Sequence, residues 1–415
     1  MLALPLLLLG LFAGDLDGDG ADDVVLASAR SGDVQILCGR TGEEWVRWPL
    51  PNATKRVLRD AAAALVPTGE GGRLEVVLVS AQPGRARVLT PWGEHVRSLG
   101  QPIPEGGEPH RWQRAVTPEG GVVVARRGYV VGYGTEHVAP VPVGRVWALD
   151  VVDDLDGDGV REFVVERPLA DDTDTRVSVV SGRDGSTVFD LEKRTSGRVA
   201  AWASSVAAVG DVDGDGTTDV AVGAPHGGLA DPPMGTRGDG GVVVHSGRDG
   251  AVFHELAPAT SFDPFTRFGA RIVPVGDVDA DGHDDFAVSA YKHDCEPAET
   301  QTGSVGVYSG RTGFPLFELF GPPGIGYFGM RMTRPGDANG DGTPDLLISS
   351  SLGWFLVSAS DGALHWTVEE GPDGFRRVDE WTVVELEGRA HRTRRICVGK
   401  QGRAGESKGE QGRGR

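Results

Sequence analysis

Two interleaved repeats constrain the fold of this chain more than any other sequence feature. A run rich in Val, Ile and Leu ends in a small-residue turn, whose last glycine recurs at Gly42, Gly93, Gly134, Gly185, Gly250, Gly313 and Gly362. An acidic loop accompanies five of these units, reading DLDGDGADD from 15, DLDGDGVRE from 154, DVDGDGTTD from 211, DVDADGHDD from 277 and DANGDGTPD from 337. Such repetition predicts small units that stack on one another, because one unit alone cannot bury its apolar faces.

Each unit is expected to be a small antiparallel β-sheet. Its apolar runs are short and bounded by turn residues, which is typical of strands, and the 63 Gly and 26 Pro argue against a helical bundle. The terminal glycine of each turn can adopt positive φ, as a hairpin with a bulge requires. Sheets of about four strands that close around an axis leave few exposed edges. The sequence therefore predicts an all-β fold, a seven-bladed β-propeller.

The propeller is expected to span residues 1–398. Residues 2–13 (LALPLLLLGLFA) are too short to cross a hydrocarbon core, which needs about twenty residues. We interpret residues 1–13 as the first strand of the fold or as the remnant of a signal segment. Strand-like runs within 375–398 follow the seventh turn, and our hypothesis is that they complete the first blade. The polar, Gly-rich residues 399–415 are predicted to form a disordered C-terminal tail.

The charge, the cysteines and the absence of known motifs exclude several classes of function. Acidic residues outnumber basic residues 60 to 41, and the formal charge of −19 argues against a nucleic-acid partner. Cys38, Cys295 and Cys397 lack metal-binding spacing and can form one disulfide at most, whose pairing stays open. The chain contains no GxSxG, HExxH or Walker A motif, so we expect it not to be an enzyme.

The acidic loop has the form Asp-x-Asp-x-Asp-Gly-x-x-Asp and predicts a metal site. Oxygen ligands at alternate positions, with a glycine that lets the chain reverse, favour calcium over transition metals. The loop differs from an EF-hand, because position twelve is aliphatic in every copy, as at Leu26 and Val165, where an EF-hand has a bidentate Glu. A strand-like run follows at once, so we expect the loop to link two strands. Without a cation, its clustered carboxylates would repel one another.

The expected ligands are the side chains at loop positions one, three, five and nine and the carbonyl oxygen at position seven. About five calcium sites are therefore predicted, one in each copy of the loop. In chain order, the residues at these positions are Asp15, Asp17, Asp19, Ala21 and Asp23; Asp154, Asp156, Asp158, Val160 and Glu162; Asp211, Asp213, Asp215, Thr217 and Asp219; Asp277, Asp279, Asp281, His283 and Asp285; and Asp337, Asn339, Asp341, Thr343 and Asp345.

With these loops, the chain resembles the FG-GAP repeats of the integrin alpha-subunit propeller and of secreted bacterial relatives. The resemblance covers nearly all of residues 1–398. It rests on the acidic loops, on Phe268-Gly269 and Phe328-Gly329 ahead of two loops, and on Gly223-Ala224-Pro225 after another. It implies a seven-bladed propeller with calcium in loops between the strands of individual blades, and an extracellular role in adhesion or recognition.

Two units depart from the pattern. The second unit has Pro67, Gly69 and Gly71 at the first three ligand positions and only Glu75 at the last, and the third unit, around residues 118–124, lacks the acids. We expect these two blades to bind no metal. Nothing resembling the other integrin domains follows the repeats, which argues against a full integrin role.

We therefore expect a calcium-binding β-propeller, outside the cell or at its surface, that acts as a non-catalytic recognition or adhesion module. Its ligand would be a protein or a carbohydrate, and the chain is expected to be a monomer without a transmembrane segment. The alternative is an enzyme on a propeller scaffold, such as a polysaccharide lyase or a quinoprotein-like dehydrogenase. Whether Arg237-Gly238-Asp239, the adhesion tripeptide, has a function stays open, because chance alone gives about half an occurrence in a chain of this composition.

Overall fold

In the computed structural model of the protein, β-strands are the only regular elements among the described residues. Turns and acidic loops join these strands, so the all-β class predicted from the repeats is confirmed. The structure describes residues 9–12, 14–27, 31, 33–49, 62–68, 73–79, 86–89, 95–99, 113–116, 122–126, 128–133, 139–169, 174–193, 195–196, 205–226, 228–229, 239–258, 266–293, 302–322, 325–371, 374–378, 381–386 and 394–400.

The first half of the chain forms four-stranded antiparallel sheets in which consecutive strands are neighbours. Their order follows the sequence because each connection is short enough to be a hairpin or a loop. The strands, sheet by sheet, are β1 (Leu9–Phe12), β2 (Val24–Ala27), β3 (Asp33–Leu37) and β4 (Glu44–Pro49); β5 (Ala62–Thr68), β6 (Arg73–Val79), β7 (Ala86–Leu89) and β8 (His95–Leu99); β9 (Gln113–Val116), β10 (Val122–Arg126), β11 (Tyr129–Tyr133) and β12 (Val141–Pro142); and β13 (Ala148–Val152), β14 (Glu162–Pro168), β15 (Thr175–Val180) and β16 (Thr187–Asp190).

The second half repeats this pattern, with extra strands at two edges. A small pair, β17 (Thr195–Ser196) with β20 (Gly228–Leu229), lies outside the meanders. The remaining strands, sheet by sheet, are β18 (Ser205–Gly210), β19 (Asp219–Gly223), β21 (Val242–His245) and β22 (Val252–Leu256); β23 (Phe268–Gly276), β24 (Asp285–Ala290), β25 (Ser304–Tyr308) and β26 (Pro315–Phe320), extended by β33 (Arg394–Lys400) and β32 (Trp381–Leu386); and β27 (Met332–Gly336), β28 (Asp345–Ser349), β29 (Gly353–Ser358), β30 (Leu364–Gly371) and β31 (Gly374–Arg377).

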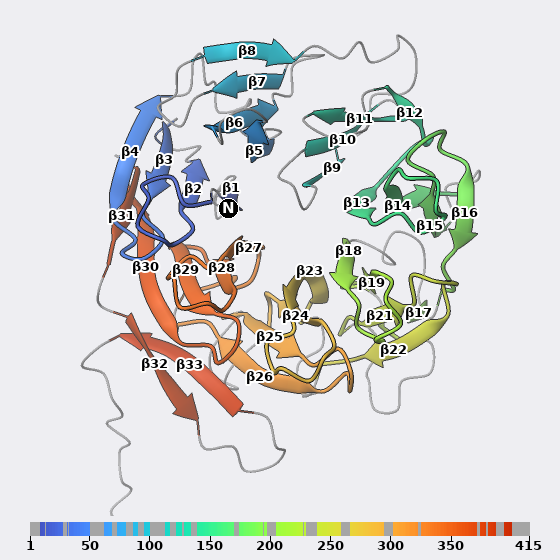
Figure 1. Ribbon diagram of the computed structural model, residues 1–415. Coiled ribbons are helices and arrows are strands. Elements are labelled where there is room, and N and C mark those ends of the chain that lie inside the picture. Colours follow the sequence, from blue (N-terminus) through green and yellow to red (C-terminus); the bar gives the residue numbers. More distant parts are fainter. Residues whose placement is uncertain are drawn as a thin grey trace, which may run out of the picture.

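The sheets are arranged radially around a common axis, with their first strands innermost (Figure 1). Strand β1 contacts β27, which contacts β23, and the contacts continue through β18 and β13 to β9. Strand β5 contacts both β1 and β10 and thereby completes the ring. The molecule therefore has the architecture of a β-propeller.

The chain termini close the ring differently from our hypothesis. The first sheet takes all four strands from the N-terminal region, with β1 paired to β2, so residues 375–398 do not complete it. Instead β31 adds to β30, and β33 pairs in parallel with β26 and extends to Lys400. The buried side-chain amide of Gln35 on β3 then joins first and last sheets, accepting from the Phe375 N–H at 2.7 Å and donating to the Phe375 carbonyl at 3.2 Å. Because β1 already fills the inner position of the first sheet, the later strands pair at outer edges.

The repeated turns have the backbone predicted from their glycines. Pairing shifts register where the third strand leads into the turn, as between Ile36 and Leu37, which marks a β-bulge. Gly93 and Gly134 lie outside the described residues. The other turn glycines have φ between 68° and 79°, namely Gly42, Gly185, Gly250, Gly313 and Gly362.

The core lies between neighbouring sheets and consists mainly of Val, Leu and Phe side chains. Between the sheets that begin with β23 and β27, Phe328 packs edge-on against Phe355 at a ring-centroid distance of 5.5 Å. Phe268, in the other Phe-Gly pair, packs in the same manner against Tyr308. The phenylalanines of both Phe-Gly pairs thus anchor the start of an inner strand in the core, and this burial orients the loop at the opposite end of that strand.

Candidate metal centres

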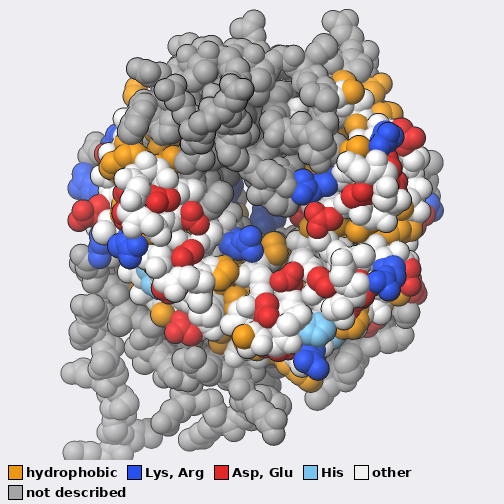
Figure 2. Space-filling view, viewed as in Figure 1, with side chains coloured by type: hydrophobic (Ala, Val, Ile, Leu, Met, Phe, Trp, Pro, Cys, Tyr) orange, Lys and Arg blue, Asp and Glu red, His pale blue; other side chains and the backbone are white. Residues whose placement is uncertain are grey.

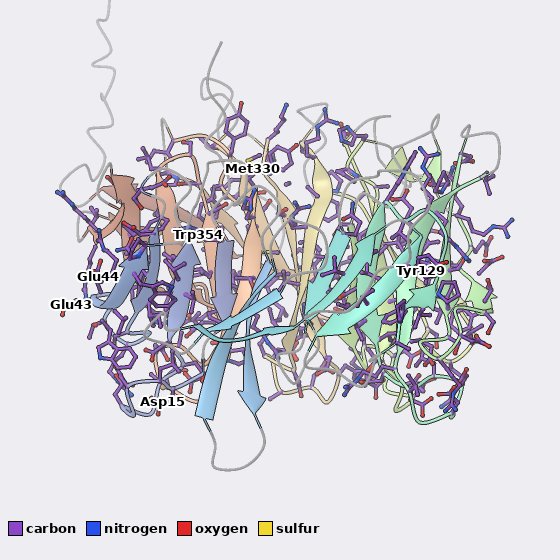
Figure 3. All side chains as sticks on the ribbon, turned by 90° about the horizontal axis from the view of Figure 1, so that it is seen from above. Asp15, Glu43, Glu44, Tyr129, Met330 and Trp354 are labelled. Atoms are coloured by element: carbon purple, nitrogen blue, oxygen red, sulfur yellow. The ribbon has the colours of Figure 1, made fainter. Side chains whose placement is uncertain are left out.

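The acidic loops all lie at one end of the sheets. Each links two strands, as predicted, and these are the first and second strand of a sheet: β1 to β2, β13 to β14, β18 to β19, β23 to β24 and β27 to β28. Figure 2 shows Asp and Glu side chains distributed over this face of the described residues. Figure 3 shows Asp15 at this edge of the molecule and Met330 at the opposite edge.

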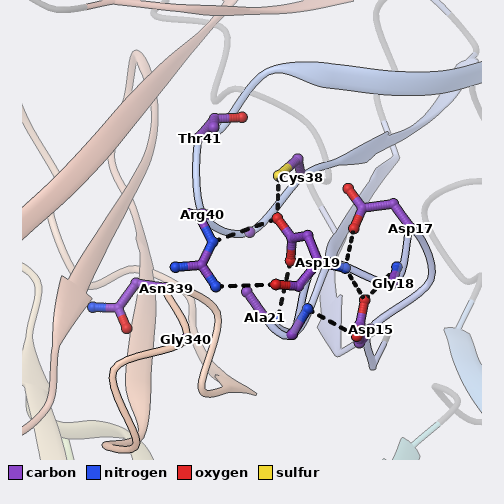
Figure 4. Close-up of polar contacts among 12 residues, drawn as sticks. Asp15, Asp17, Gly18, Asp19, Ala21, Cys38, Arg40, Thr41, Asn339 and Gly340 are labelled. Atoms are coloured by element: carbon purple, nitrogen blue, oxygen red, sulfur yellow. Dashed lines mark hydrogen bonds and ion pairs between the residues drawn. The ribbon is translucent and has the colours of Figure 1, made fainter.

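The first carboxylate of each loop folds the loop around itself. In the first loop, Asp15 Oδ1 accepts the Gly18 and Asp19 N–H groups at 2.6 and 3.1 Å, and Asp15 Oδ2 accepts the Gly20 N–H at 3.0 Å (Figure 4). Gly20 reverses the chain with a φ of 85°, which favours glycine strongly. The same pattern recurs at Asp154 and Asp337. Backbone donors therefore hold the position-one carboxylate inside the turn.

Four loops bring three or more carboxylates together. The ligand-type oxygen atoms in each cluster lie within 4.8 Å of one another. In the first, third and fourth loops the position-five Asp lies outside this cluster, whereas in the second loop it belongs to it. The clusters are Asp15, Asp17 and Asp23; Asp154, Asp156, Asp158 and Glu162; Asp211, Asp213 and Asp219; and Asp277, Asp279 and Asp285.

The position-nine carboxylate is the buried member of each cluster. In the third loop, Asp219 Oδ2 accepts the Val212 and Asp213 N–H groups at 2.8 and 3.1 Å, and its Oδ1 accepts the Gly247 N–H at 2.8 Å. The N–H groups of Gly39 and Gly310 donate in the same manner to the position-nine carboxylates of the first and fourth loops. These hydrogen bonds lower the pKa of the carboxyl groups, but burial has the larger effect. The pKa of Asp23, Asp219 and Asp285 is therefore raised to about 6.

Glu162 in the second loop is the exception. Its longer side chain is fully buried, and Oε2 accepts the Leu155 N–H, but Oε1 has no hydrogen-bond partner. Burial, followed by the charges of Asp156 and Asp154, raises the pKa of Glu162 to about 7. A buried, unpartnered carboxylate oxygen is costly, and this one lies among three further carboxylates. The residues of this loop therefore fit a hard divalent cation.

An arginine from the turn pairs with the position-five carboxylate, which sequence reasoning missed. Arg183 Nε donates to Asp158 Oδ2 at 2.5 Å, and Arg248 Nε lies 3.0 Å from Asp215 Oδ2. Arg40 pairs more loosely with Asp19, at 3.5 Å (Figure 4). The signal was present in the sequence, because the turns read CGRTG and SGRDG beside every such loop. Position five is thus already partly neutralised in these three loops.

The fifth loop has a different arrangement. His365 Nε2 lies 3.0 Å from Oδ1 of the buried Asp345, where the first, third and fourth loops place a glycine N–H. Asn339 Nδ2 is 2.9 Å from the same imidazole nitrogen. Burial by itself would lower the pKa of His365. The hydrogen bond to Asp345 and the neighbouring negative charges outweigh burial and leave this pKa above its ordinary value. Sequence spacing did not indicate His365, because it lies on β30, twenty positions after its partner.

The position-seven residues approach the loop through their backbone. The Ala21 and Val160 N–H groups donate to the position-five carboxylates of their loops at 2.9 and 2.8 Å. Thr217 and Thr343 do the same and add hydroxyl contacts, while His283 directs its imidazole toward the Val212 carbonyl at 3.0 Å. Metal ligation by the position-seven carbonyl oxygens stays a prediction.

Several other predictions concern residues that the structure describes only in part. The side chains of the second unit, including Glu75, are not described, and neither are Arg237 and Gly238. Asp239 is buried, with 2% of its surface exposed. Cys38 is a free thiol that donates to Asp19 at 3.4 Å. Within the described residues, no helix is long and apolar enough to span a membrane.

Comparisons with known proteins find sequence similarity to FG-GAP repeats and to integrin alpha chains. The FG-GAP repeat family matches residues 202–245. Integrin alpha-V of Gallus gallus is 32% identical over 216 residues, which are 48% of this chain and 19% of that protein. Integrin alpha-3 of Mus musculus is 31% identical over 162 residues, 37% of this chain and 14% of that protein. The matched region thus spans less than one fifth of either relative.

Solved structures give weaker similarities. The Pan2 WD40 domain of Neurospora crassa aligns with a TM-score of 0.46 at 10% identity, covering 82% of this chain and 84% of that chain. The Dos1 propeller aligns with a TM-score of 0.43 at 10% identity, covering 90% and 82%. The sequence matches support the resemblance expected from the acidic loops and the Phe-Gly pairs: residues 202–245 match the FG-GAP repeat, and 48% of the chain is similar to integrin alpha-V.

Proposed function

We propose that this protein is a seven-bladed β-propeller whose five acidic loops bind calcium, and that it acts outside the cell as a non-catalytic recognition or adhesion module. The FG-GAP match and the similarity to integrin alpha chains support the recognition role. The propeller expected at residues 1–398 would be a monomer, and the tail expected at 399–415 would begin after Lys400, the last residue of β33. Its partner would be a protein or a carbohydrate.

The observation that carries the calcium proposal is the unpartnered, buried Oε1 of Glu162 among three further carboxylates. All ligand candidates in this loop are oxygen atoms, which suits Ca²⁺ better than softer metals. The bound ion would tie the β13–β14 connection together and offset the repulsion among its carboxylates. Recurrence of the cluster in three further loops supports several such sites.

The proposed location outside the cell agrees with this ligand chemistry. Extracellular calcium modules bind with dissociation constants of about 0.1 to 1 mM, because the ion is abundant there. These loops are exposed at their tips, as at Asp17 and Asp156, and three of them already hold an arginine beside position five. Both features favour modest calcium affinity.

The test compares thermal unfolding of the calcium-free and calcium-loaded protein. Calcium at 100 times its dissociation constant should stabilise the fold by about 2.7 kcal/mol for each independent site. Isothermal titration calorimetry should count about five sites, and magnesium at equal concentration should stabilise less, because it keeps its water shell. A melting temperature that chelator and calcium leave unchanged would contradict the proposal.

A further inference from the structure

A basic cluster lies at the face opposite the acidic loops. Strand β23 has an acidic loop after its last residue and Arg267 just before its first. Strands β19 and β24 begin at position-nine ligands and end near His226 and Lys292. Each residue therefore lies at the far end of a strand from a carboxylate cluster, on the side where Figure 3 places Met330. We call His226, Arg267 and Lys292 the basic cluster.

The three residues are held together by described contacts. Arg267 Nη1 donates to Nδ1 of His226 and lies 3.4 Å from the Pro225 carbonyl. The Lys292 N–H donates to the Thr266 carbonyl at 3.0 Å, which places Lys292 beside Arg267. Burial, followed by the charges of Arg267 and Lys292, lowers the pKa of His226. The imidazole therefore serves as a neutral acceptor between two cations.

Within the described part of the chain, the two cations have no carboxylate as a counter-charge. Arg267 and Lys292 form no ion pair with any carboxylate among the described residues, and the buried Nε of Arg267 has no hydrogen-bond partner. Arg271, nearby on β23, donates to the Ala270 carbonyl at 2.8 Å and likewise has no described carboxylate partner. In a chain of formal charge −19, gathering cations without acids is unfavourable unless an anion joins them.

The backbone at this face is strained in a repeated manner. Arg267 and Tyr327, each directly before a Phe-Gly pair, have φ values of 67° and 65°, which non-glycine residues rarely adopt. Both are fixed by the same turn, closed by the Ala270 and Met330 N–H groups at 3.1 and 3.0 Å. Half-buried Tyr327 lies 6.3 Å from Tyr291, the neighbour of Lys292. A pair of aromatic rings thus borders the cations.

We infer that His226, Arg267 and Lys292 form a binding site for a short acidic segment of a partner protein, with Tyr291 and Tyr327 packing beside that segment. This inference rests on the proposed recognition function and names the chemistry of its ligand. Two carboxylates would supply the counter-charges that the described residues do not offer to Arg267 and Lys292. A short segment fits better than a long polyanion, because the described cluster offers only two cations, Arg267 and Lys292.

The experiment measures binding of a fluorescein-labelled tetra-aspartate peptide by fluorescence anisotropy in fixed, saturating calcium. A tetra-asparagine peptide serves as the uncharged control. The variants are Arg267→Gly and Lys292→Gln, with Arg176→Gln on β15 as the matched control, because Arg176 is an exposed arginine in another sheet. Arg267→Gly removes the guanidinium and accommodates the positive φ, so the melting temperature should not fall.

We expect the wild type to prefer the aspartate peptide, each cluster variant to weaken binding roughly tenfold, and Arg176→Gln to leave it unchanged. Equal binding of the two peptides, or no effect of either cluster variant, would overturn the inference. So would a sulfated polysaccharide that binds through the same residues while the peptide does not. Calcium-dependent melting is measured on the same samples, so failure of peptide binding alone leaves the proposed calcium module standing.

Discussion

The second and fifth acidic loops share one spacing and yet balance their buried charge in different ways. In the second loop, Oε1 of Glu162 has no partner and lies among three other carboxylates. In the fifth loop, Asp345 already contacts the His365 imidazole, and Asn339 replaces one carboxylate. The comparison teaches that repeated ligand positions need not imply equal demand for a cation, because neighbouring strands can supply a positive group.

The largest expected effect on stability concerns the strands that follow the second and fifth loops, β14 and β28. Buried Glu166 on β14 occupies the position that Ser349 takes on β28, and burial raises its pKa from 4.5 to about 8. The folded state then keeps a proton that the unfolded chain releases between these values, so stability falls as pH rises through this window. We expect Glu166→Gln to flatten this dependence and to stabilise the protein by about 3 kcal/mol near pH 9, as measured by urea unfolding.

The second prediction concerns the position-nine carboxylates themselves. In chelator near pH 8, Glu162→Gln should stabilise the fold by about 2 kcal/mol, because it removes an unpartnered buried charge. Asp345→Asn should destabilise it by about 1 kcal/mol, because one amide oxygen cannot accept both from His365 and from the Asn339 N–H. Urea unfolding of both variants measures whether each substitution raises or lowers the free energy of unfolding. If both change it in the same direction, the contrast between the two loops is wrong.

The third prediction tests the imidazole as an internal cation. Near pH 6, below the raised pKa of His365, His365→Gln should lower the free energy of unfolding in chelator by about 1.5 kcal/mol, since Asp345 keeps only a neutral donor. Added calcium should recover the loss, so the calcium-induced rise in melting temperature should exceed that of the wild type. His226→Gln, on the opposite face, is the control. A calcium response identical to that of the wild type would show that His365 does not substitute for the ion.

The smallest effect concerns the turn arginines. The second loop has Arg183 beside Asp158, whereas the turn of the fifth loop has Ser360 at the matching position. Because this ion pair is exposed, Arg183→Ser should change calcium affinity by about twofold at most and leave the melting temperature nearly unaltered. Calorimetric titration at two salt concentrations measures this effect. A loss of calcium binding would instead place the arginine among the essential groups of the loop.

Much of the site was predictable because its determinants are local. The spacing of carboxylates and glycines sets the loop fold through hydrogen bonds that span only a few residues, as around Asp15 and Asp337. His365 and Gln35 could not be found in this way. Their partners lie on other strands or across the ring seam, and no residue spacing encodes such contacts. The hypothesis for the C-terminal strands was wrong for the same reason.

The sequence by itself determined the repeat, the strand character of the apolar runs, the loops between strands and the positive φ of the turn glycines, since all of these depend on neighbours along the chain. Tertiary structure alone decided which strands close the ring, which oxygen of Glu162 is left without a donor and where the basic cluster gathers. The physical reason is that several strands are similar short runs buried at every position, so their local pattern does not distinguish one partner from another. Partner choice therefore depends on the packing of distant surfaces and on which charges burial brings together.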